Sequence, residues 1–272
     1  MTRAAAAGLA GLALCGLAGC GGSSRAATST AAPGVPAAAV APRVAPVVTG
    51  ALPHDPAAFT EGLVWHDGVF YESTGLYGSS DVRRVRPSDG RVLARRALPR
   101  RMFGEGLALV RGRLVQLTWK ERTALVWDTR GLRRAGGFRY AGQGWGLARL
   151  GRRLVMSDGT ATLRVVDPAT FRVVRRVRVT DGGAPVTQLN ELEVIRGRIW
   201  ANVWQSDDIV VIDPATGRVR LRIDGSGLRG LLPPGGRPEV LNGIAWDPAS
   251  QAVYVTGKWW PRVFRLRLPG VA

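Results

Sequence analysis

Phe59-Thr60-Glu61-Gly62-Leu63 and Phe103-Gly104-Glu105-Gly106-Leu107 are two copies of one short phrase that recurs along the chain. Three looser copies follow, namely Gln143-Gly144-Trp145-Gly146-Leu147, Leu189-Asn190-Glu191-Leu192 and Leu241-Asn242-Gly243-Ile244. The steps between the equivalent positions Gly62, Gly106, Gly146, Glu191 and Gly243 are 44, 40, 45 and 52 residues. A period of about 45 residues with several short strands per unit is typical of propeller blades.

Each repeat also has the strand pattern of a blade. After the opening phrase come four short apolar runs, separated by Gly or Asp-Pro turns and without a competing helical period. The fifth repeat ends after its third strand, Arg262 to Leu268, which would leave an open edge. The stretch Val44 to Thr49 can fill this gap. We therefore predict an all-β, five-bladed β-propeller closed by its own N-terminal strand. A β-sandwich is the alternative, but it does not explain the repeated phrase.

The topology of an antiparallel pair places the polar residues. The start of the first strand and the end of the second lie at the same end of a blade. One mouth of the channel should therefore gather Glu61, Glu105, Asn190, Asn242, Lys258, Trp119, Trp145 and Trp204. A concave aromatic pocket with a few polar groups is the usual form of a small-ligand site.

The N-terminal region reads as an export signal followed by a tether. Residues 1–19 have a basic start, an apolar run and small residues at the end, as secretory signals do. Leu17-Ala18-Gly19-Cys20 resembles a bacterial lipobox, which implies cleavage before Cys20 and lipid attachment to it. An ordinary signal cut near a chance cysteine is the alternative. Residues 20–43 are rich in Ala, Ser, Thr and Pro, which predicts a tether before the propeller domain, 44–272. We expect an exported protein, lipid-anchored at the cell envelope.

The formal net charge of +18 invites a nucleic-acid interpretation, which the sequence does not favour. Only Lys120 and Lys258 are lysines, and the arginines are spread over every repeat. Many stand at alternate strand positions, which indicates solvated outer faces. No nucleic-acid-binding motif is present, so we predict no nucleic-acid partner and, at most, a weak attraction to anionic lipid.

The five phrases, together with Asn202-Val203-Trp204 and Thr256-Gly257-Lys258, resemble the plant and bacterial type of glutaminyl-peptide cyclotransferase over about residues 44–268. The resemblance implies a five-bladed propeller that converts N-terminal glutamine of peptides or proteins to pyroglutamate and releases ammonia. It places the family's site on Phe59, Glu61, Phe103, Glu105, Trp119, Trp145, Asn190, Trp204 and Lys258. Plant members often carry Gln where this chain has Glu61, so the pocket gains a second carboxylate.

This chemistry needs proton transfer and charge stabilisation. The attacking amine is tethered to the amide that it attacks, so little entropy is lost on cyclisation. One carboxylate can act first as general base and then as general acid, and Glu105 is the candidate. Lys258 or Asn190 could donate to the developing oxyanion. The tryptophans would exclude water and hold the glutaminyl side chain.

Other interpretations of the same residues stay open. Glu105 could cap loop amides, and Asn190 and Asn242 suit turns with positive φ. His54 and His66, 12 residues apart, make a poor metal pair, and no calcium loop is present. We therefore expect no metal and no cofactor, which disfavours a lactonase-like propeller. A lipid-anchored propeller that binds a peptide or protein without turning it over is the alternative function. We expect a monomer.

Overall fold

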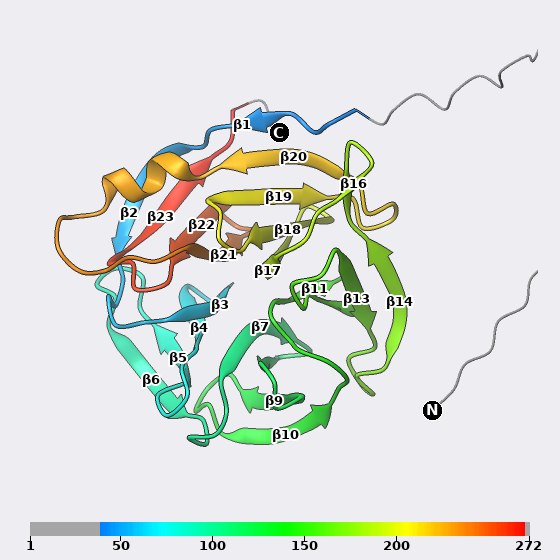
Figure 1. The fold of residues 1–272 in the computed structure, drawn as a ribbon. Coiled ribbons are helices and arrows are strands. Elements are labelled where there is room, and N and C mark those ends of the chain that lie inside the picture. The colour runs from blue at the N-terminus through cyan, green and yellow to red at the C-terminus, as the bar shows by residue number, and fades with distance from the viewer. Residues whose placement is uncertain (1–38, 270–272) are drawn as a thin grey trace, which may run out of the picture. The chain divides into compact units, whose positions relative to one another are not determined.

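Five antiparallel sheets, one for each sequence repeat, stand around a common axis (Figure 1). The computed structural model describes residues 39–269. Blades one to three hold β3 (Thr60–His66), β4 (Val69–Thr74), β5 (Asp81–Val85) and β6 (Val92–Ala97); β7 (Gly104–Val110), β8 (Arg113–Thr118), β9 (Thr123–Asp128) and β10 (Arg134–Arg139); and β11 (Leu147–Leu150), β12 (Arg153–Met156), β13 (Thr162–Val166) and β14 (Val173–Arg178). The predicted propeller is confirmed, and the β-sandwich alternative is wrong.

The last two blades contain the N-terminal strands. Blade four is β17 (Leu189–Ile195), β18 (Arg198–Val203), β19 (Asp208–Ile212) and β20 (Val219–Asp224), extended by β1 (Arg43–Val44), which runs parallel to β20. Blade five is β21 (Leu241–Asp247), β22 (Ala252–Gly257), β23 (Arg262–Arg267) and β2 (Val47–Pro53). The connections between blades add β15 (Thr180–Asp181), β16 (Ala184–Pro185) and a 3₁₀ helix, η1 (Ser226–Leu231). None of the helical segments in residues 39–269 has the length and apolar character that crossing a bilayer requires.

The ring closes where β2 pairs with β23, which confirms closure by an N-terminal strand. The predicted strand, 44–49, is offset from the observed one. Residues 43–44 instead pair with blade four, and Arg43 bonds both Asp208 and Asp224. Two residues before β1, the Ala41 N–H donates to Asp181 at 2.7 Å. Pairing with β23 extends to Pro53. Proline has no N–H to donate, and it is tolerated here because β2 is the outer strand of its sheet.

A buried ion pair reinforces this closure. His54 follows β2 and lies between Trp260 of blade five and Glu72 of blade one. Its Nδ1 is 2.6 Å from the Trp260 carbonyl oxygen and its Nε2 is 2.9 Å from Glu72. Two acceptor oxygens favour the doubly protonated ring, and the charge of Glu72 raises the pKa of His54 against the opposing effect of burial. With both of its nitrogens engaged in this way, His54 joins the first and last blades.

The repeated phrase folds as a β-bulge in four of the five blades. The register of the first strand against the second shifts between Thr60 and Gly62, Gly104 and Leu107, Leu189 and Leu192, and Leu241 and Ile244. A bulge turns side chains out of the regular alternation, here toward the mouth of the channel. The phrase glycines let the inner strands approach closely, since a Cβ on Gly106 would lie 2.4 Å from the Leu147 nitrogen.

Glu191 takes the glycine's place in blade four. Its carboxylate accepts the N–H groups of Leu63 at 3.4 Å and of Ile244 at 2.8 Å. The Glu191 side chain therefore ties three inner strands together at the axis. Burial raises the pKa of Glu191 well above its usual range, and the nearby charge of Glu193 adds to the effect.

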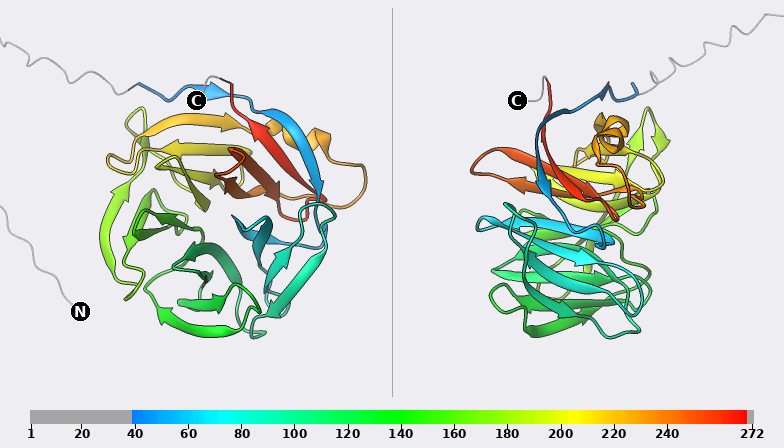
Figure 2. Two further views of the ribbon diagram at one scale, coloured as in Figure 1. Left: turned by 180° about the vertical axis from the view of Figure 1, so that it is seen from behind. Right: turned by 90° about the vertical axis from the view of Figure 1, so that its left-hand side faces the viewer.

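The apolar core lies between the blades, whose arrangement is seen from behind and from the side in Figure 2. Each sheet buries both faces against its neighbours, so inner strands read as continuous apolar runs. Between blades three and four, for example, the core contains Val155, Leu163, Ile199 and Val210, all fully buried. This packing fixes the strand ends that carry the polar pocket.

Candidate active site

A pocket of about 260 Å³ lies at the mouth formed by the opening phrases and the second-strand ends. The inner strands β3, β7, β11, β17 and β21 surround the axis there (Figure 1). It is lined by Phe59, Glu61, Phe103, Glu105, Trp119, Trp145, Asn190, Trp204, Glu239 and Lys258. The structure thus brings all nine sequence-predicted site residues together and adds one, Glu239.

Glu61 and Lys258 form a buried ion pair at the floor. The Lys258 Nζ lies 2.7 Å from Glu61 Oε1, and both side chains are almost fully buried. Asn242 donates to Glu61 Oε2 at 3.1 Å and to the Thr60 carbonyl oxygen. Burial raises the pKa of Glu61, and the Lys258 charge opposes this effect. Asn242 was predicted at the mouth, but it lies beneath Glu61 and positions that carboxylate.

Glu105 is a buried carboxyl group without a partner. It is 5% exposed, and its Oε2 accepts no hydrogen bond from any residue in the described part of the chain. Burial raises the pKa of Glu105 well above its usual range, and the charge of Glu61 raises it further while Lys258 opposes. A group that capped loop amides would accept their N–H bonds, so this geometry disfavours the capping interpretation. Glu105 is therefore a carboxyl group whose free oxygen can exchange a proton with a ligand.

Aromatic rings form the walls of the pocket. Phe103 packs edge-on against Phe59 with centroids 6.1 Å apart, and lies 5.6 Å from Trp119. On the other side Trp145 and Trp204 meet in a T-shaped pair at 5.5 Å. All five rings are half-buried, so each presents a face or edge to the pocket. Such a wall excludes water and strengthens the electrostatic interactions inside.

Backbone and polar neighbours fix these rings. The Gln143 side-chain oxygen accepts both the Trp119 Nε1–H at 2.7 Å and the Trp145 Nε1–H at 3.0 Å. Gly159 has a φ of +81°, and a Cβ there would lie 2.7 Å from the Trp145 ring. Only glycine both adopts this positive φ without strain and leaves room for the Trp145 ring. Glu121 accepts the Phe103 N–H at 3.2 Å and so positions that residue.

Asn190 is buried, and its side-chain amide has no hydrogen-bond partner within residues 39–269. Its backbone carbonyl accepts the Ser157 hydroxyl at 2.7 Å. Neither Asn190 nor Asn242 adopts positive φ, so that interpretation is wrong. Positive φ falls instead on Gln188 and Gly243 beside them. The Asn190 amide is therefore available to a ligand.

Two contributors were missed by sequence reasoning. Glu239 comes from the long connection between β20 and β21, which has no counterpart in the other repeats. Its backbone is tied to the site because its N–H donates to the Lys258 carbonyl at 2.9 Å and its carbonyl accepts from Trp260. Gln143 stands within the third phrase, two residues before Trp145, and this spacing was the one sequence signal for it. Its bond to Trp119 joins residues that are 24 positions apart and could not be predicted from the sequence.

In the described residues, no three His, Cys, Asp or Glu side chains converge as a metal-binding group. The polar groups that do converge are an acid, a cation–carboxylate pair and a free amide. Fold and pocket together define a five-bladed propeller with an enclosed acid–base site at one mouth of its channel.

Comparisons with known proteins agree with this geometry. The sequence model of the glutamine cyclotransferase family matches residues 20–268. A glutaminyl-peptide cyclotransferase of Arabidopsis thaliana is 45% identical over 225 residues, which are 81% of this chain and 70% of that protein. The crystal structure of Myxococcus xanthus glutaminyl cyclase has a TM-score of 0.80 and 40% sequence identity, covering 85% of this chain and 100% of that one. The chain belongs to the glutamine cyclotransferase family.

Proposed function

We propose that this chain is a glutaminyl-peptide cyclotransferase, which converts the N-terminal glutamine of a peptide or protein to pyroglutamate and releases ammonia. The names of both relatives support the activity. The observation that carries it is the buried, unpartnered Glu105 opposite the Glu61–Lys258 pair inside an aromatic pocket. A pocket of about 260 Å³ has room for one glutaminyl residue with its peptide leaving through the mouth.

Cyclisation begins when the neutral α-amine attacks the carbon of the side-chain amide. An N-terminal amine has a pKa of about 8, so the ammonium form first releases a proton to solvent and the neutral amine is the nucleophile. As the new C–N bond forms, the amine nitrogen becomes positively charged, and Glu105 as a carboxylate accepts one of its two protons. It then delivers the proton to the amide nitrogen, the old C–N bond breaks, and the nitrogen leaves as ammonia. A carboxyl group with a raised pKa suits both steps, because it is a stronger base than an ordinary carboxylate and, once protonated, still an acid able to return the proton.

The carbonyl oxygen becomes negative while the tetrahedral carbon exists. Lys258 keeps further N–H donors beyond the one that Glu61 occupies. Asn190 offers its amide from the adjacent blade. Either group could donate to the oxygen in a water-poor pocket, where such bonds are strong. The tryptophans would enclose the methylene groups of the substrate.

The alternative is a propeller that binds peptides without turning them over. Binding needs the aromatic wall, but it does not need a buried carboxyl group that lacks any partner. Leaving such a group unpaired costs folding free energy, on the order of 1–3 kcal/mol. A catalytic role explains why Glu105 is kept in this state, so we favour the enzyme.

Ammonia release measured with a short Gln-initiated peptide tests the proposal. The same peptide with an acetylated N-terminus is the control, because it has no nucleophilic amine. We expect ammonia release only from the peptide with a free N-terminus, and the mass of that peptide should fall by the mass of one ammonia molecule. Tight binding of the free peptide with no release above the uncatalysed rate would favour the binding alternative.

We further propose that catalysis needs no metal, since Glu61 and Lys258 engage each other rather than forming a ligand set. Activity should survive exhaustive chelation, and a loss that zinc restores would contradict this. The expected monomer is testable by light scattering.

Export and lipid attachment at Cys20 also remain proposals, because they fall outside the described residues. Their support is the Leu17-Ala18-Gly19-Cys20 pattern. Mass spectrometry of the mature N-terminus tests them, with Cys20→Ser as control. An N-terminus cut elsewhere and without lipid would contradict the anchor.

A further inference from the structure

A second cavity lies at the opposite end of the propeller from the active site. It has a volume of about 380 Å³ and lies between blades four and five. Its residues include the β17–β18 turn at Arg196 and the β21–β22 turn at Gln251. Asn190 lies near the start of β17 at the active-site mouth, and Ile195 ends that strand here, about 17 Å away at the usual rise per residue.

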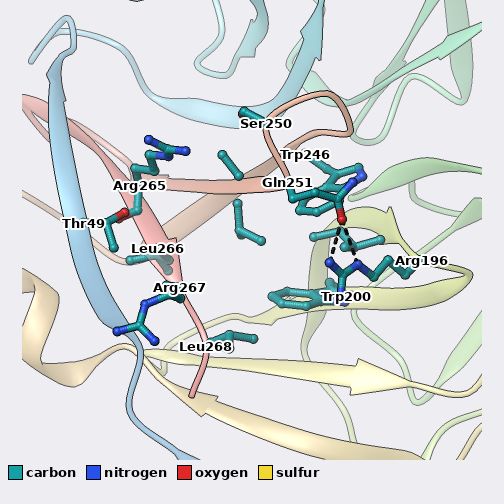
Figure 3. Close-up of a pocket in the computed structure, with 13 residues that line it drawn as sticks. Thr49, Arg196, Trp200, Trp246, Ser250, Gln251, Arg265, Leu266, Arg267 and Leu268 are labelled. Atoms are coloured by element: carbon teal, nitrogen blue, oxygen red, sulfur yellow. Dashed lines mark hydrogen bonds between the residues drawn. The ribbon is translucent and has the colours of Figure 1, made fainter. Parts of the chain in front are cut away.

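This groove combines an apolar floor with a cationic rim. Trp200, which is 4% exposed, lies with Val253 and Leu266 at the floor. The rim on one side carries Arg265 and Arg267, which are both exposed and stand two residues apart on β23. Figure 3 shows these two arginines with Thr49 along one side of the groove.

The other side of the groove is ordered by contacts among its own residues. Arg196 donates from Nε and Nη2 to the Gln251 side-chain oxygen at 3.1 and 2.6 Å (Figure 3). Its guanidinium also lies 5.8 Å from the centroid of the half-buried Trp246 ring. The guanidinium is therefore held at the rim by a neutral amide and an aromatic ring, and its positive charge stays uncompensated.

No carboxylate of residues 39–269 lies within ion-pair distance of Arg196, Arg265 or Arg267. Elsewhere in the described chain most Asp side chains are paired with arginines, as Asp213 is with Arg198. Three exposed cations around an apolar, tryptophan-containing groove suit a ligand that has an anionic head and an apolar body. Arginine and tryptophan are also the side chains that occupy the headgroup region of membranes.

The surrounding turns extend this positive surface. The turns between first and second strands in blades two, three and four each carry two exposed arginines, namely Arg111 and Arg113, Arg152 and Arg153, and Arg196 and Arg198. These three turns contain no acidic residue. Arg153 and Arg198 pair with Asp167 and Asp213 from neighbouring turns, so the charges that stay uncompensated at this end are those of Arg111, Arg113, Arg152 and Arg196.

We propose that the groove between blades four and five seats the headgroup of an anionic phospholipid, so that this end of the propeller docks on a bilayer. The active-site mouth then faces away from the membrane and stays open to peptides. This inference rests on the groove and the turn arginines, and it does not depend on the proposed catalytic function or on lipid attachment.

Vesicle cosedimentation tests this docking without the anchor. The chain from residue 20 onward with Cys20→Ser is suitable, because every strand of the propeller lies within residues 43–267. Vesicles of phosphatidylcholine with phosphatidylglycerol are compared with phosphatidylcholine alone. Each arginine near an anionic surface contributes on the order of 5-fold in partitioning, so R196Q/R265Q/R267Q should bind the anionic vesicles about 100-fold more weakly.

The matched control removes the same charge from the other end, as R100Q/R101Q/R122Q, all exposed residues of the active-site loops. It should lose less than about 10-fold. Gln251→Glu is a milder variant that neutralises Arg196 and should weaken binding about 5-fold, which keeps the test valid if the triple variant does not fold. Ammonia release from a soluble peptide should be unchanged in Gln251→Glu.

Three results would overturn the proposal. They are equal binding to both kinds of vesicle, equal losses in the groove and control variants, and displacement of the vesicles by duplex DNA at equal phosphate concentration. The last result would identify a polyanion surface rather than a lipid-docking one.

Discussion

Replacing Glu105 with glutamine removes the proposed proton carrier and changes little else. The side chain is 5% exposed and has no hydrogen-bond partner in the described structure, so the substitution breaks no bond. Glutamine has nearly the same shape, and its amide replaces one unpaired buried polar group with another. The free energy of unfolding should therefore change by less than about 1 kcal/mol.

The catalytic rate should respond far more strongly. A positioned general acid–base group contributes roughly 10²–10⁴-fold, which corresponds to about 3–5 kcal/mol of transition-state stabilisation. Because Glu105 serves two successive proton transfers in the proposed mechanism, its loss affects kcat. The KM should move little, since the aromatic wall and the Glu61–Lys258 pair remain in place.

The assay is ammonia release from a Gln-initiated peptide, followed over a range of peptide concentrations, with a thermal melt of each variant. Glu121→Gln makes the same chemical change at a residue that positions Phe103, and it should cost less than about 10-fold. Near-full turnover in Glu105→Gln would refute the assignment, and Glu61 would be the next acid to test.

The other buried charges give further expectations. Glu61→Gln removes the charge that raises the Glu105 pKa, so the acid limb of the rate–pH profile should move to lower pH; an unmoved limb would contradict the coupling. Losing one member of its ion pair should also destabilise the fold by roughly 1–3 kcal/mol, seen as a lower melting temperature. His54→Gln should cost about 3–5 kcal/mol in chemical denaturation, because it leaves the buried Glu72 carboxylate without its cationic partner; a loss below about 1 kcal/mol would argue against a charged pair. Burial raises the pKa of Glu193 to about 8, whereas the pKa of a Glu side chain in an unfolded chain is about 4.3. Between these two pH values the folded state keeps the Glu193 proton and the unfolded state has lost it. Stability should therefore fall as pH rises from about 4.3 to about 8, and thermal melts of Glu193→Gln should show a flatter dependence.

The ring of blades was predictable because each sequence repeat corresponds to one blade. Equivalent positions recur at a nearly constant spacing, and antiparallel pairing then fixes which strand ends meet. The closing strand was harder to place. Gly50 and Pro53 interrupt the alternation that marks a strand, and they belong to β2 only because β23 offers a free edge. Such pairing over the length of the chain leaves no local signal.

The pocket also has residues that the sequence predicts and residues that it does not. Residues carried by the repeat, such as Glu105 and Trp145, could be placed from strand topology. Glu239 could not, because its connection occurs once and includes a 3₁₀ helix that no repeat predicts. The absence of any bond to Glu105, and the amide that links two tryptophans, are properties of three-dimensional packing. They required the structure.

Closure by an N-terminal strand has a consequence for the order of folding. Thr49 bonds Arg265 across 216 residues, so β2, which is synthesised before any blade, must wait for β23, the last strand. Blades one to four can form from contacts within each repeat, whereas blade five cannot be completed until the whole chain is present. Moving residues 39–53 to a position after the C-terminus would make β2 and β23 neighbours in sequence. Such a circular permutant should refold faster while keeping the same closed ring.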